Sequence, residues 1–264
     1  MGVKELLDLS GKVAVVTGGS RGLGLQLAEG LGEMGAKVML VARKRDELDS
    51  AQAALRGHGI DVATVAADIA KPDAATTVCD AALEAFGTVD ILVNNAGAIW
   101  VAPTEETSDA GWTKMLEVNV SGAFRLCREI GRRVMIPRRF GKIVNIASIG
   151  GIRGTPLGMS NHTVAYSASK GAMVNFTRAL ATEWGPHNIN VNCVCPGNFR
   201  SVMSATYIDA QGDEIAALTP LRRVGNDQDF KGAVIYFASE ASSFVTGQIL
   251  AVDGGITVTY PAPP

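Results

Sequence analysis

The chain has 264 residues, of which 47% are hydrophobic, enough to form the core of one large α/β domain without a second domain. Its formal net charge of -2 gives no general attraction to nucleic acid or to an anionic membrane, so we expect neither as a partner. The amino terminus lacks the apolar core of a signal peptide and no apolar run reaches the length that spans a bilayer, so we expect a cytoplasmic protein.

Apolar runs of strand length recur along the chain and alternate with helical patterns. The runs cover residues 12–17, 37–42, 62–66, 91–94, 142–147, 190–194 and 249–252. They are nearly continuous in Val, Ile and Ala, which indicates strands buried on both faces of a parallel sheet. We therefore predict a Rossmann-type, doubly wound α/β fold, a single domain over residues 1–264 with about seven parallel strands and helices on both faces.

A glycine-rich turn follows the first apolar run. Residues 17–24 read TGGSRGLG and open a helical pattern at Leu23. The first N–H groups of a helix lack intrahelical partners and lie at the positive end of its dipole, so they bind a pyrophosphate where no Cβ blocks it. Because another strand-like run follows this helix, the turn predicts a dinucleotide site. Its predicted ligands are Gly18, Ser20, Arg21, Gly22, Leu23 and Gly24.

Polar residues and glycines follow the other apolar runs. In a doubly wound sheet, ligands bind beyond the carboxyl ends of the strands, so these residues are predicted to line one crevice. Each of them taken singly is equally compatible with an ordinary turn. The set comprises Arg43, Asp68, Ile69, Asn94, Asn95, Ala96, Gly97, Ser148, Pro196 and Gly197.

Tyr166 and Lys170 stand four residues apart in a helical pattern that runs to Trp184, so both point to the same helix face. A nearby ammonium favours the phenolate, so we expect Lys170 to lower the pKa of Tyr166. The phenol would then exchange a proton with a substrate oxygen that Ser148 also binds, while hydride moves to or from a nicotinamide. The mechanism requires no metal.

The histidines and cysteines do not suggest a metal centre. The three histidines, His58, His162 and His187, are scattered, and the cysteines lack the spacing of metal ligands. We expect buried, unreactive thiols. The cysteines are Cys79, Cys127, Cys193 and Cys195.

The chain resembles the short-chain dehydrogenase/reductase family along essentially its whole length. The shared motifs are TGGSRGLG at 17–24, NNAG at 94–97, Asn119, Ser148, YSASK at 166–170 and PG at 196–197. The resemblance implies a catalytic tetrad of Asn119, Ser148, Tyr166 and Lys170, in which Asn119 holds a water. It also implies that Asp68 contacts adenine, Asn95 braces the cofactor site, Lys170 binds the nicotinamide ribose, and Pro196 and Gly197 lie against the nicotinamide.

Two segments depart from the family pattern. Residues 155–162 lengthen the segment between Ser148 and Tyr166, and this insertion is either a substrate contact through Met159 and His162 or a solvated loop. After Gly197, relatives often carry a threonine that contacts the carboxamide, and here Ser201 is the candidate replacement.

The end of the second strand-like run predicts the cofactor. An acidic residue there binds the ribose 2′-OH of NAD, whereas an arginine accommodates the 2′-phosphate of NADP. This chain has Arg43 and Lys44, with no carboxylate before Asp46, and Arg21 adds a second guanidinium. We therefore expect NADP rather than NAD, unless these cations are only solvated charges at a helix start.

The substrate is less well defined. Residues 198–218 are predicted to form a lid, with Phe199, Met203, Tyr207 and Ile208 among polar residues. The whole pattern is most similar to gluconate 5-dehydrogenases and 3-oxoacyl reductases, so a sugar acid and a 3-oxoacyl thioester are the two substrate classes. A group of arginines is either a docking site for an acyl carrier protein or a solvated face. These are Arg128, Arg132, Arg133, Arg138 and Arg139.

Two further expectations concern activity and assembly. A sensor or scaffold that binds NADP(H) without turnover is the alternative from another class, and retention of Ser148, Tyr166 and Lys170 favours an oxidoreductase. Residues 244–255 resemble the family's final strand, which commonly meets a partner subunit, so we expect a homotetramer with twofold symmetry. The interface candidates on the tyrosine helix are Ala172, Met173, Phe176 and Leu180.

Overall fold

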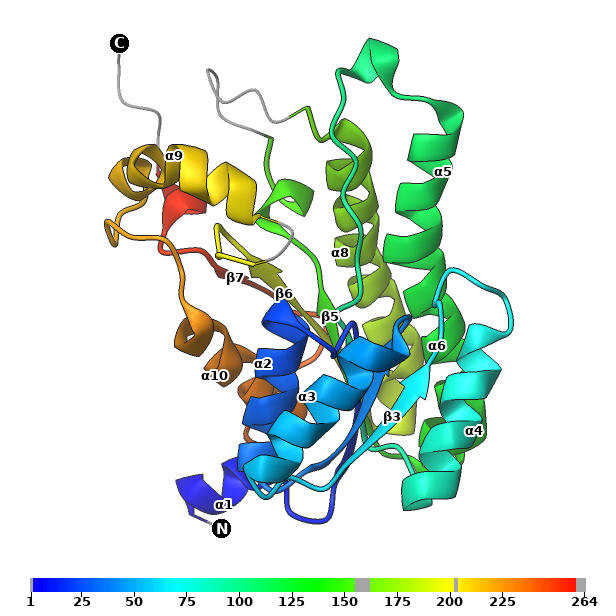
Figure 1. Cartoon of the computed structure of the whole chain (residues 1–264). Helices are drawn as coiled ribbons and strands as arrows, with labels where there is room; N and C mark the ends of the chain where they lie inside the picture. Colours follow the sequence, from blue (N-terminus) through cyan, green and yellow to red (C-terminus); the bar gives the residue numbers. More distant parts are fainter. Residues whose placement is uncertain (1, 155–161, 202–203, 260–264) are drawn as a thin grey trace.

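A single parallel sheet of seven strands forms the centre of the molecule (Figure 1). The computed structural model describes residues 2–154, 162–201 and 204–259. The strand order is β3-β2-β1-β4-β5-β6-β7, and every pairing is parallel. The strands are β1 (Val13–Thr17), β2 (Lys37–Ala42), β3 (Val62–Ala66), β4 (Ile91–Asn94), β5 (Gly141–Ile146), β6 (Ile189–Pro196) and β7 (Ile249–Val252). The predicted fold class and number of strands are confirmed.

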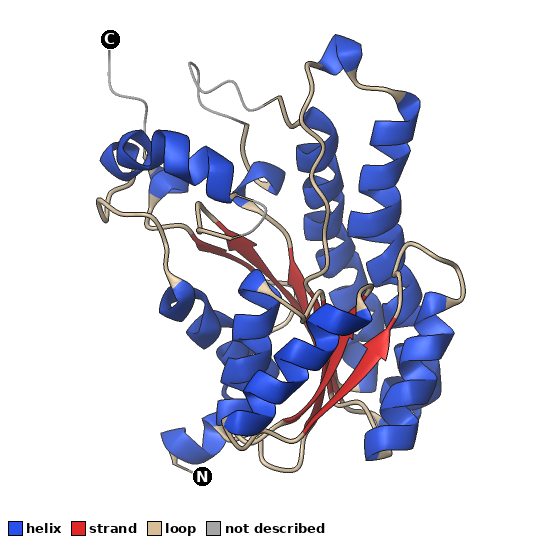
Figure 2. Ribbon diagram, viewed as in Figure 1, coloured by secondary structure: helices blue, strands red, loops and turns tan. Residues whose placement is uncertain are grey.

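Helices cover both faces of the sheet (Figure 2). One face carries α2 (Gly22–Glu33), α3 (Arg45–Gly57) and α10 (Asp227–Ala238). The other carries α4 (Ala74–Phe86), α5 (Asp109–Leu116), α6 (Gly122–Ile130) and α8 (Val164–Trp184). The remaining α-helices are α1 (Val3–Leu7), α7 (Ile136–Arg138) and α9 (Ala205–Leu218). Short 3₁₀ or π turns are η1 (Thr104–Glu106), η2 (Glu117–Ser121), η3 (Gly131–Met135), η4 (Ile149–Gly151), η5 (Gly185–His187), η6 (Glu240–Ser242) and η7 (Ile256–Val258).

The central strands are buried along their length because they have helices on both sides. Every residue of β1, β4 and β5 is buried, whereas β7 at the sheet edge is only half-buried. This burial explains why the apolar runs are continuous and why their bounds predicted the strands closely. The four cysteines are free and buried, which confirms the prediction of enclosed thiols.

The strand order creates the crevice that the sequence predicts. From β1 the chain builds outward through β2 to β3 on one side, and then crosses back so that β4 pairs with the other side of β1. The connections therefore diverge at the carboxyl ends of β1 and β4, where doubly wound folds bind ligands. Helix α9 follows β6 and lies beyond the ends of β6 and β7 (Figure 1).

Two of the four residues of α8 predicted to meet a partner subunit are buried within their own subunit. Met173 and Leu180 are 1% and 7% exposed, because they pack against the sheet of their own subunit. Ala172 is exposed, and Phe176 is half-buried with its ring edge-on to Phe124 of α6. Only these last two of the four candidates face outward.

Among the described residues, no helix has the length and apolar character needed to cross a membrane.

Candidate active site

The glycine turn between β1 and α2 has a backbone that only glycine accommodates. Gly18 has φ +65° and its N–H donates to the carbonyl of Val41 at 2.8 Å, while Gly22 has φ +55°. A Cβ on Gly24 would lie 2.1 Å from the carbonyl oxygen of Gly18. The turn therefore folds tightly over the first turn of the helix, which explains the spacing of its glycines.

Asn95 holds this turn against the end of β4. Its side-chain amide donates to the carbonyls of Thr17 at 2.8 Å and Gly18 at 3.4 Å. In return, the hydroxyl of Thr17 accepts from the backbone N–H groups of Asn95 and Ala96, each at 3.0 Å. These four bonds join the ends of β1 and β4 where the crevice opens.

The start of α2 has room for a pyrophosphate. Among the described residues, a Cβ added to Gly22 would have one heavy-atom neighbour within 4 Å outside its own helix and chain neighbours, the Cβ of Ser201 at 3.9 Å. The backbone before the helix is extended at Arg21, and no side chain caps the first turn. The described residues thus fit the phosphate end of a dinucleotide, with Ser201 across the crevice from the glycine turn.

Asn119 lies on η2, the π turn that joins α5 to α6. The side chain is 3% exposed, and both of its polar atoms bond to the backbone of Ala98, which follows the NNAG motif. Its oxygen accepts from the Ala98 N–H at 2.8 Å, and its nitrogen donates to the Ala98 carbonyl at 3.0 Å. The nitrogen also donates to the hydroxyl of Ser169 on α8 at 2.8 Å, so Asn119 ties that helix to the crevice.

Lys170 and Tyr166 share one face of α8, as predicted. The Lys170 ammonium lies 5.7 Å from the centre of the Tyr166 ring and donates to the carbonyl of Ile146 at 2.8 Å. Burial of this ammonium lowers the pKa of Lys170 to about 8. A Cβ on Gly97 would approach the ammonium nitrogen to 3.5 Å and the Asn119 oxygen to 3.3 Å, so the glycine keeps the space beside both open.

The pKa shift of Tyr166 is opposite in direction to the shift expected from the sequence. Burial of the phenol raises its pKa, and a hydrogen bond with the Ser148 side chain opposes that effect. The expected lowering by Lys170 was wrong for the structure described, because the ammonium is directed to the Ile146 carbonyl and desolvation of the phenol dominates. The phenol is therefore a proton donor at neutral pH.

Ser148 lies two residues beyond the end of β5 and caps η4, where its hydroxyl accepts from the N–H of Gly150 at 3.1 Å. The following turn packs directly on α8, since a Cβ on Gly151 would lie 2.6 Å from the backbone carbon of Lys170. This close approach brings Ser148 to the tyrosine. The four residues predicted for catalysis thus come together from η2, η4 and α8.

Other predicted cofactor residues line the same edge of the sheet. The Asp68 carboxylate accepts from the N–H of Ala70 at 3.2 Å, while Ile69 is buried. After β6, the N–H of Gly197 donates to Val252 at 2.9 Å, and a Cβ there would lie 2.7 Å from Asp253. The hydroxyl of Ser201 bonds to that of Ser204 at 3.0 Å.

Of the two arginines predicted to bind the cofactor phosphate, one is unpaired within the described part of the chain, and the other contacts Glu47, a residue of α3 that the sequence did not single out. Arg43 is exposed and has no hydrogen bond or ion pair with any residue that the structure describes. Arg21 instead pairs with Glu47 of α3 at 3.1 Å. The sequence signal was the pair of carboxylates directly after the basic residues, but only the fold brings Glu47 to the glycine turn.

One residue of the predicted lid belongs to the core, and other residues of the lid and the insertion lie outside the described residues. Phe199 is 6% exposed and packs edge-on against Phe230 in the core, so it is not a substrate contact. Met203 and Met159 fall outside the described residues. His162 is described, and its carbonyl accepts from the N–H of Ala102 at 3.0 Å.

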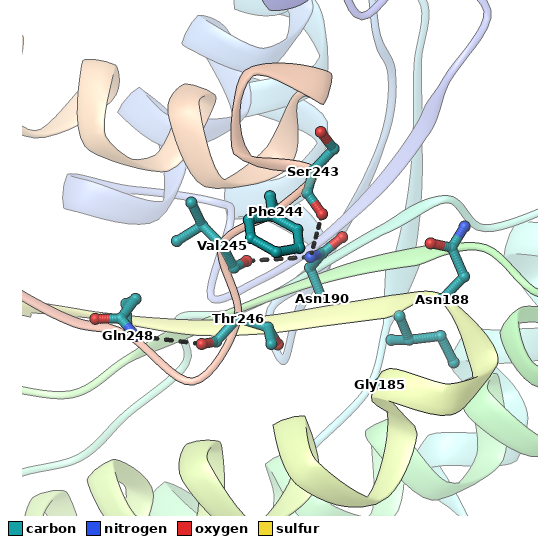
Figure 3. A pocket seen from close by; sticks show the side chains of 9 residues that line it. Gly185, Asn188, Asn190, Ser243, Phe244, Val245, Thr246 and Gln248 are labelled. Atoms are coloured by element: carbon teal, nitrogen blue, oxygen red, sulfur yellow. Dashed lines mark hydrogen bonds between the residues drawn. The ribbon is translucent and has the colours of Figure 1, made fainter.

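A hollow of about 560 Å³ occurs at the opposite end of the sheet (Figure 3). It is lined by residues before and at the start of β6 and by the segment before β7. Asn190 of β6 donates its amide to the carbonyls of Ser243 and Val245. Phe244 in its wall is fully exposed. Because it lies at the amino ends of these strands, this hollow is separate from the crevice.

Comparison with known proteins identifies the family. A family model described as enoyl-(acyl carrier protein) reductase matches residues 18–257. Gluconate 5-dehydrogenase of Gluconobacter oxydans (strain 621H) is 40% identical over 257 residues, covering 97% of this chain and 98% of the relative.

Solved structures agree with that assignment. A gluconate 5-dehydrogenase from Burkholderia cenocepacia J2315, in complex with NADP and tartrate, has a TM-score of 0.92 at 32% identity, with 98% of this chain and 100% of that chain covered. A 3-oxoacyl (acyl-carrier-protein) reductase from Agrobacterium tumefaciens C58 with NADP bound has a TM-score of 0.88 at 29% identity, with 96% and 97% covered.

The chain belongs to the short-chain dehydrogenase/reductase family. The resemblance read from the sequence motifs is confirmed, including the branch that contains gluconate 5-dehydrogenases and 3-oxoacyl reductases. The protein is accordingly an NAD(P)-dependent oxidoreductase that acts on CH–OH or carbonyl groups.

The depressed pKa of Lys170 predicts a pH dependence of stability. The folded state releases this proton near pH 8 and the unfolded state near 10.5, so between these values the unfolded chain binds more protons. Stability from this group therefore rises with pH across that window. Lys170→Met removes the effect, and urea unfolding at about pH 7 and about pH 9.5 measures it. An equal pH dependence in wild type and variant would contradict the burial of a titrating ammonium.

Proposed function

We propose that Asn119, Ser148, Tyr166 and Lys170 are the catalytic residues of a reversible hydride transfer between NADP(H) and a carbonyl or secondary alcohol. The observation that supports this most strongly is that Asn119 and Lys170 lie beside Gly97, while Tyr166 lies next to Lys170 and bonds to Ser148. A buried ammonium next to a phenolic proton donor favours an enzyme over a sensor or scaffold that only binds the cofactor.

In reduction, the Tyr166 phenol donates its proton to the substrate oxygen, and in oxidation it takes the proton back. The Ser148 hydroxyl, which bonds to that phenol, donates a hydrogen bond to the same oxygen and fixes its position. NADP(H), when bound, supplies or accepts the hydride. A protonated Lys170 beside the ring stabilises negative charge that develops on the phenol oxygen during proton transfer.

Asn119 acts on the geometry of the site. Its side chain joins Ala98, which follows the NNAG segment, to Ser169 on α8, next to Lys170. That connection keeps the lysine in place beside the cofactor segment. By resemblance to the family it also holds a water that links Lys170 to solvent.

The cofactor proposal has two parts. The pyrophosphate would lie on the glycine turn and the start of α2, with Ser20, Arg21 and Leu23 around it, and the adenine beside Asp68 and Ile69. The nicotinamide would lie near Ala96, Pro196, Gly197 and Ser201. Two observations support a preference for NADP over NAD. The Arg43 guanidinium just after β2 has no partner among the described residues, and both related crystal structures contain NADP.

For the substrate we propose a sugar acid, oxidised or reduced as in the gluconate 5-dehydrogenases that this chain resembles. Within the predicted lid range 198–218, helix α9 would cover the substrate, whereas Phe199 belongs to the core. Reduction of a 3-oxoacyl thioester is the second candidate, supported by similarity to a 3-oxoacyl reductase. Initial rates with NADPH across ketoacids, ketones and 3-oxoacyl thioesters separate the two.

The arginine cluster gives no support to docking of an acyl carrier protein. Arg133 pairs with Asp80 at 2.7 Å and Arg138 with Asp90 at 3.0 Å, while Arg132 bonds to Glu129. These guanidiniums are partly neutralised within their own subunit. They also come before β5, at the end of the sheet away from the crevice.

We also propose a homotetramer in the cytoplasm. Phe124 of α6 is 46% exposed and lies edge-on to Phe176 of α8, so the two rings form one apolar face. The open edge strand β7, with Phe244 near its start, forms a second. Two isologous contacts of this kind assemble four subunits with twofold symmetry. Four free, buried cysteines suit a reducing compartment.

Tyr166→Phe removes the proton donor and keeps the ring, so we expect kcat to fall by roughly 10² to 10⁴ while NADPH binding persists. Steady-state rates and fluorescence titration of NADPH measure the two effects. Tyr236→Phe on α10 is the matched control and should leave kcat unchanged. Activity of Tyr166→Phe within about threefold of wild type would rule out the acid–base role.

Arg43→Asp should weaken NADPH much more than NADH, because it replaces a phosphate-binding guanidinium with a like charge. Fluorescence titration of both cofactors gives the ratio of their dissociation constants. Arg56→Asp makes the same charge change at the far end of α3 and should preserve the ratio. An unchanged ratio in Arg43→Asp would contradict the role of this residue.

Light scattering at micromolar concentration should give the mass of four chains. Phe124→Glu places a charge in one of the two proposed apolar faces, so it should reduce the assembly to a dimer. Val3→Glu, on the exposed helix α1, is the control that should remain tetrameric. A monomeric wild type would refute the proposed assembly.

A further inference from the structure

The carboxylate of Glu47 occupies the centre of a cationic cluster at the glycine turn. One of its oxygens lies 3.1 Å from the Arg21 guanidinium and 3.0 Å from the Lys44 ammonium. The other oxygen accepts from the Ser20 hydroxyl at 3.2 Å. A guanidinium, an ammonium and a hydroxyl around one anion form the donor set that also binds a phosphate group.

These contacts differ from the usual role of an acidic residue in the first turn of a helix. Such a residue normally bonds to N–H groups of its own helix or interacts with its dipole. The Glu47 side chain reaches instead to the segment between β1 and α2, and no bond from the backbone of α3 to it is found among the described residues. The three donors hold the pKa of Glu47 below its usual value, so it stays an anion at neutral pH.

The position of this cluster relates it to the ribose of the cofactor. Ser20 and Arg21 belong to the turn after β1, and Lys44 lies two residues beyond the end of β2. In dinucleotide folds the ribose 2′-oxygen is recognised between these two segments. The same cations are therefore the groups that a 2′-phosphate would reach, together with Arg43, which the described structure leaves unpaired.

We propose that Glu47 determines cofactor specificity by acting as an internal competitor for the 2′-phosphate of NADP(H). This inference rests on the proposed function, since it concerns the same cofactor site. A 2′-phosphate that enters the cluster must displace the carboxylate or lie beside a like charge, and either event weakens its binding. The 2′-hydroxyl of NAD(H) meets no such repulsion and can donate a hydrogen bond to the carboxylate.

The main consequence is that Glu47 narrows the preference for NADP over NAD without abolishing it. Arg43 attracts the phosphate, and Glu47 offsets part of that attraction by keeping Arg21 and Lys44 neutralised. The balance between the two residues then sets the selectivity, which explains how a basic strand end can coexist with a carboxylate in the same cluster.

The test uses Glu47→Gln, which keeps the shape of the side chain and removes its charge. Dissociation constants for NADPH and NADH are measured by fluorescence titration of the full-length protein. Adenosine 2′,5′-bisphosphate and adenosine 5′-monophosphate, titrated by calorimetry, isolate the phosphate from the nicotinamide end. Asp49→Asn removes the same charge from an exposed position on α3 and serves as the control.

We expect Glu47→Gln to tighten NADPH and the bisphosphate by about threefold to tenfold, while NADH and the monophosphate stay unchanged or weaken. Glu47→Asp, which keeps the negative charge on a shorter side chain, should fall between the variant and wild type. Equal changes for both cofactors, no change, or the same change in Asp49→Asn would overturn the proposal.

The same titrations separate this inference from the proposed cofactor preference. If wild type binds NADPH no more tightly than NADH but Glu47→Gln shifts the ratio, the proposed preference fails and the role of Glu47 stands. If wild type prefers NADPH and Glu47→Gln leaves the ratio unchanged, the inference fails and the proposed preference stands.

Discussion

The hydrogen bonds between Asn95 and Thr17 are the constraint on which the rest of the site depends. They join the ends of β1 and β4 at the point where the chain reverses its direction of sheet growth. The same amide reaches Gly18, so the strand junction and the glycine turn form one unit. Asn119 extends it from Ala98 to α8, which carries the tyrosine and lysine. A few short polar bonds thus place the proposed cofactor and proton-transfer groups relative to one another.

Burial sets the electrostatics of the site more than the spacing of its charges does. The enclosed phenol of Tyr166 has a raised pKa, and the enclosed ammonium of Lys170 has a lowered one. Each group is therefore closer to its neutral form than in water, and the neutral phenol can donate its proton to a substrate oxygen in reduction. At the cofactor edge, neighbouring charges matter more than burial. The Glu47 carboxylate lies beside two exposed cations, Arg21 and Lys44, which favour its charged form.

The sequence predicted the sheet and the motif positions well, because both depend on local patterns. Buried parallel strands need continuous apolar runs, and the glycine turn needs residues without Cβ atoms, as Gly24 illustrates. Properties that depend on packing were not predictable in the same way. Met173 and Leu180 could not be distinguished from surface residues, the desolvation of Tyr166 outweighed its neighbouring cation, and the contact of Glu47 with Arg21 joins residues of different elements.

The central claim is that the tight glycine turn forms the phosphate-binding half of the site, and Gly24→Ala tests it most directly. The new methyl group would collide with the carbonyl oxygen of Gly18, whereas Gly57→Ala places the same group in open space on α3. We predict that calorimetric titration of NADPH shows at least about a tenfold loss of affinity for Gly24→Ala and none for Gly57→Ala, with circular dichroism unchanged in both. Equal NADPH affinities in the two folded variants would contradict the account.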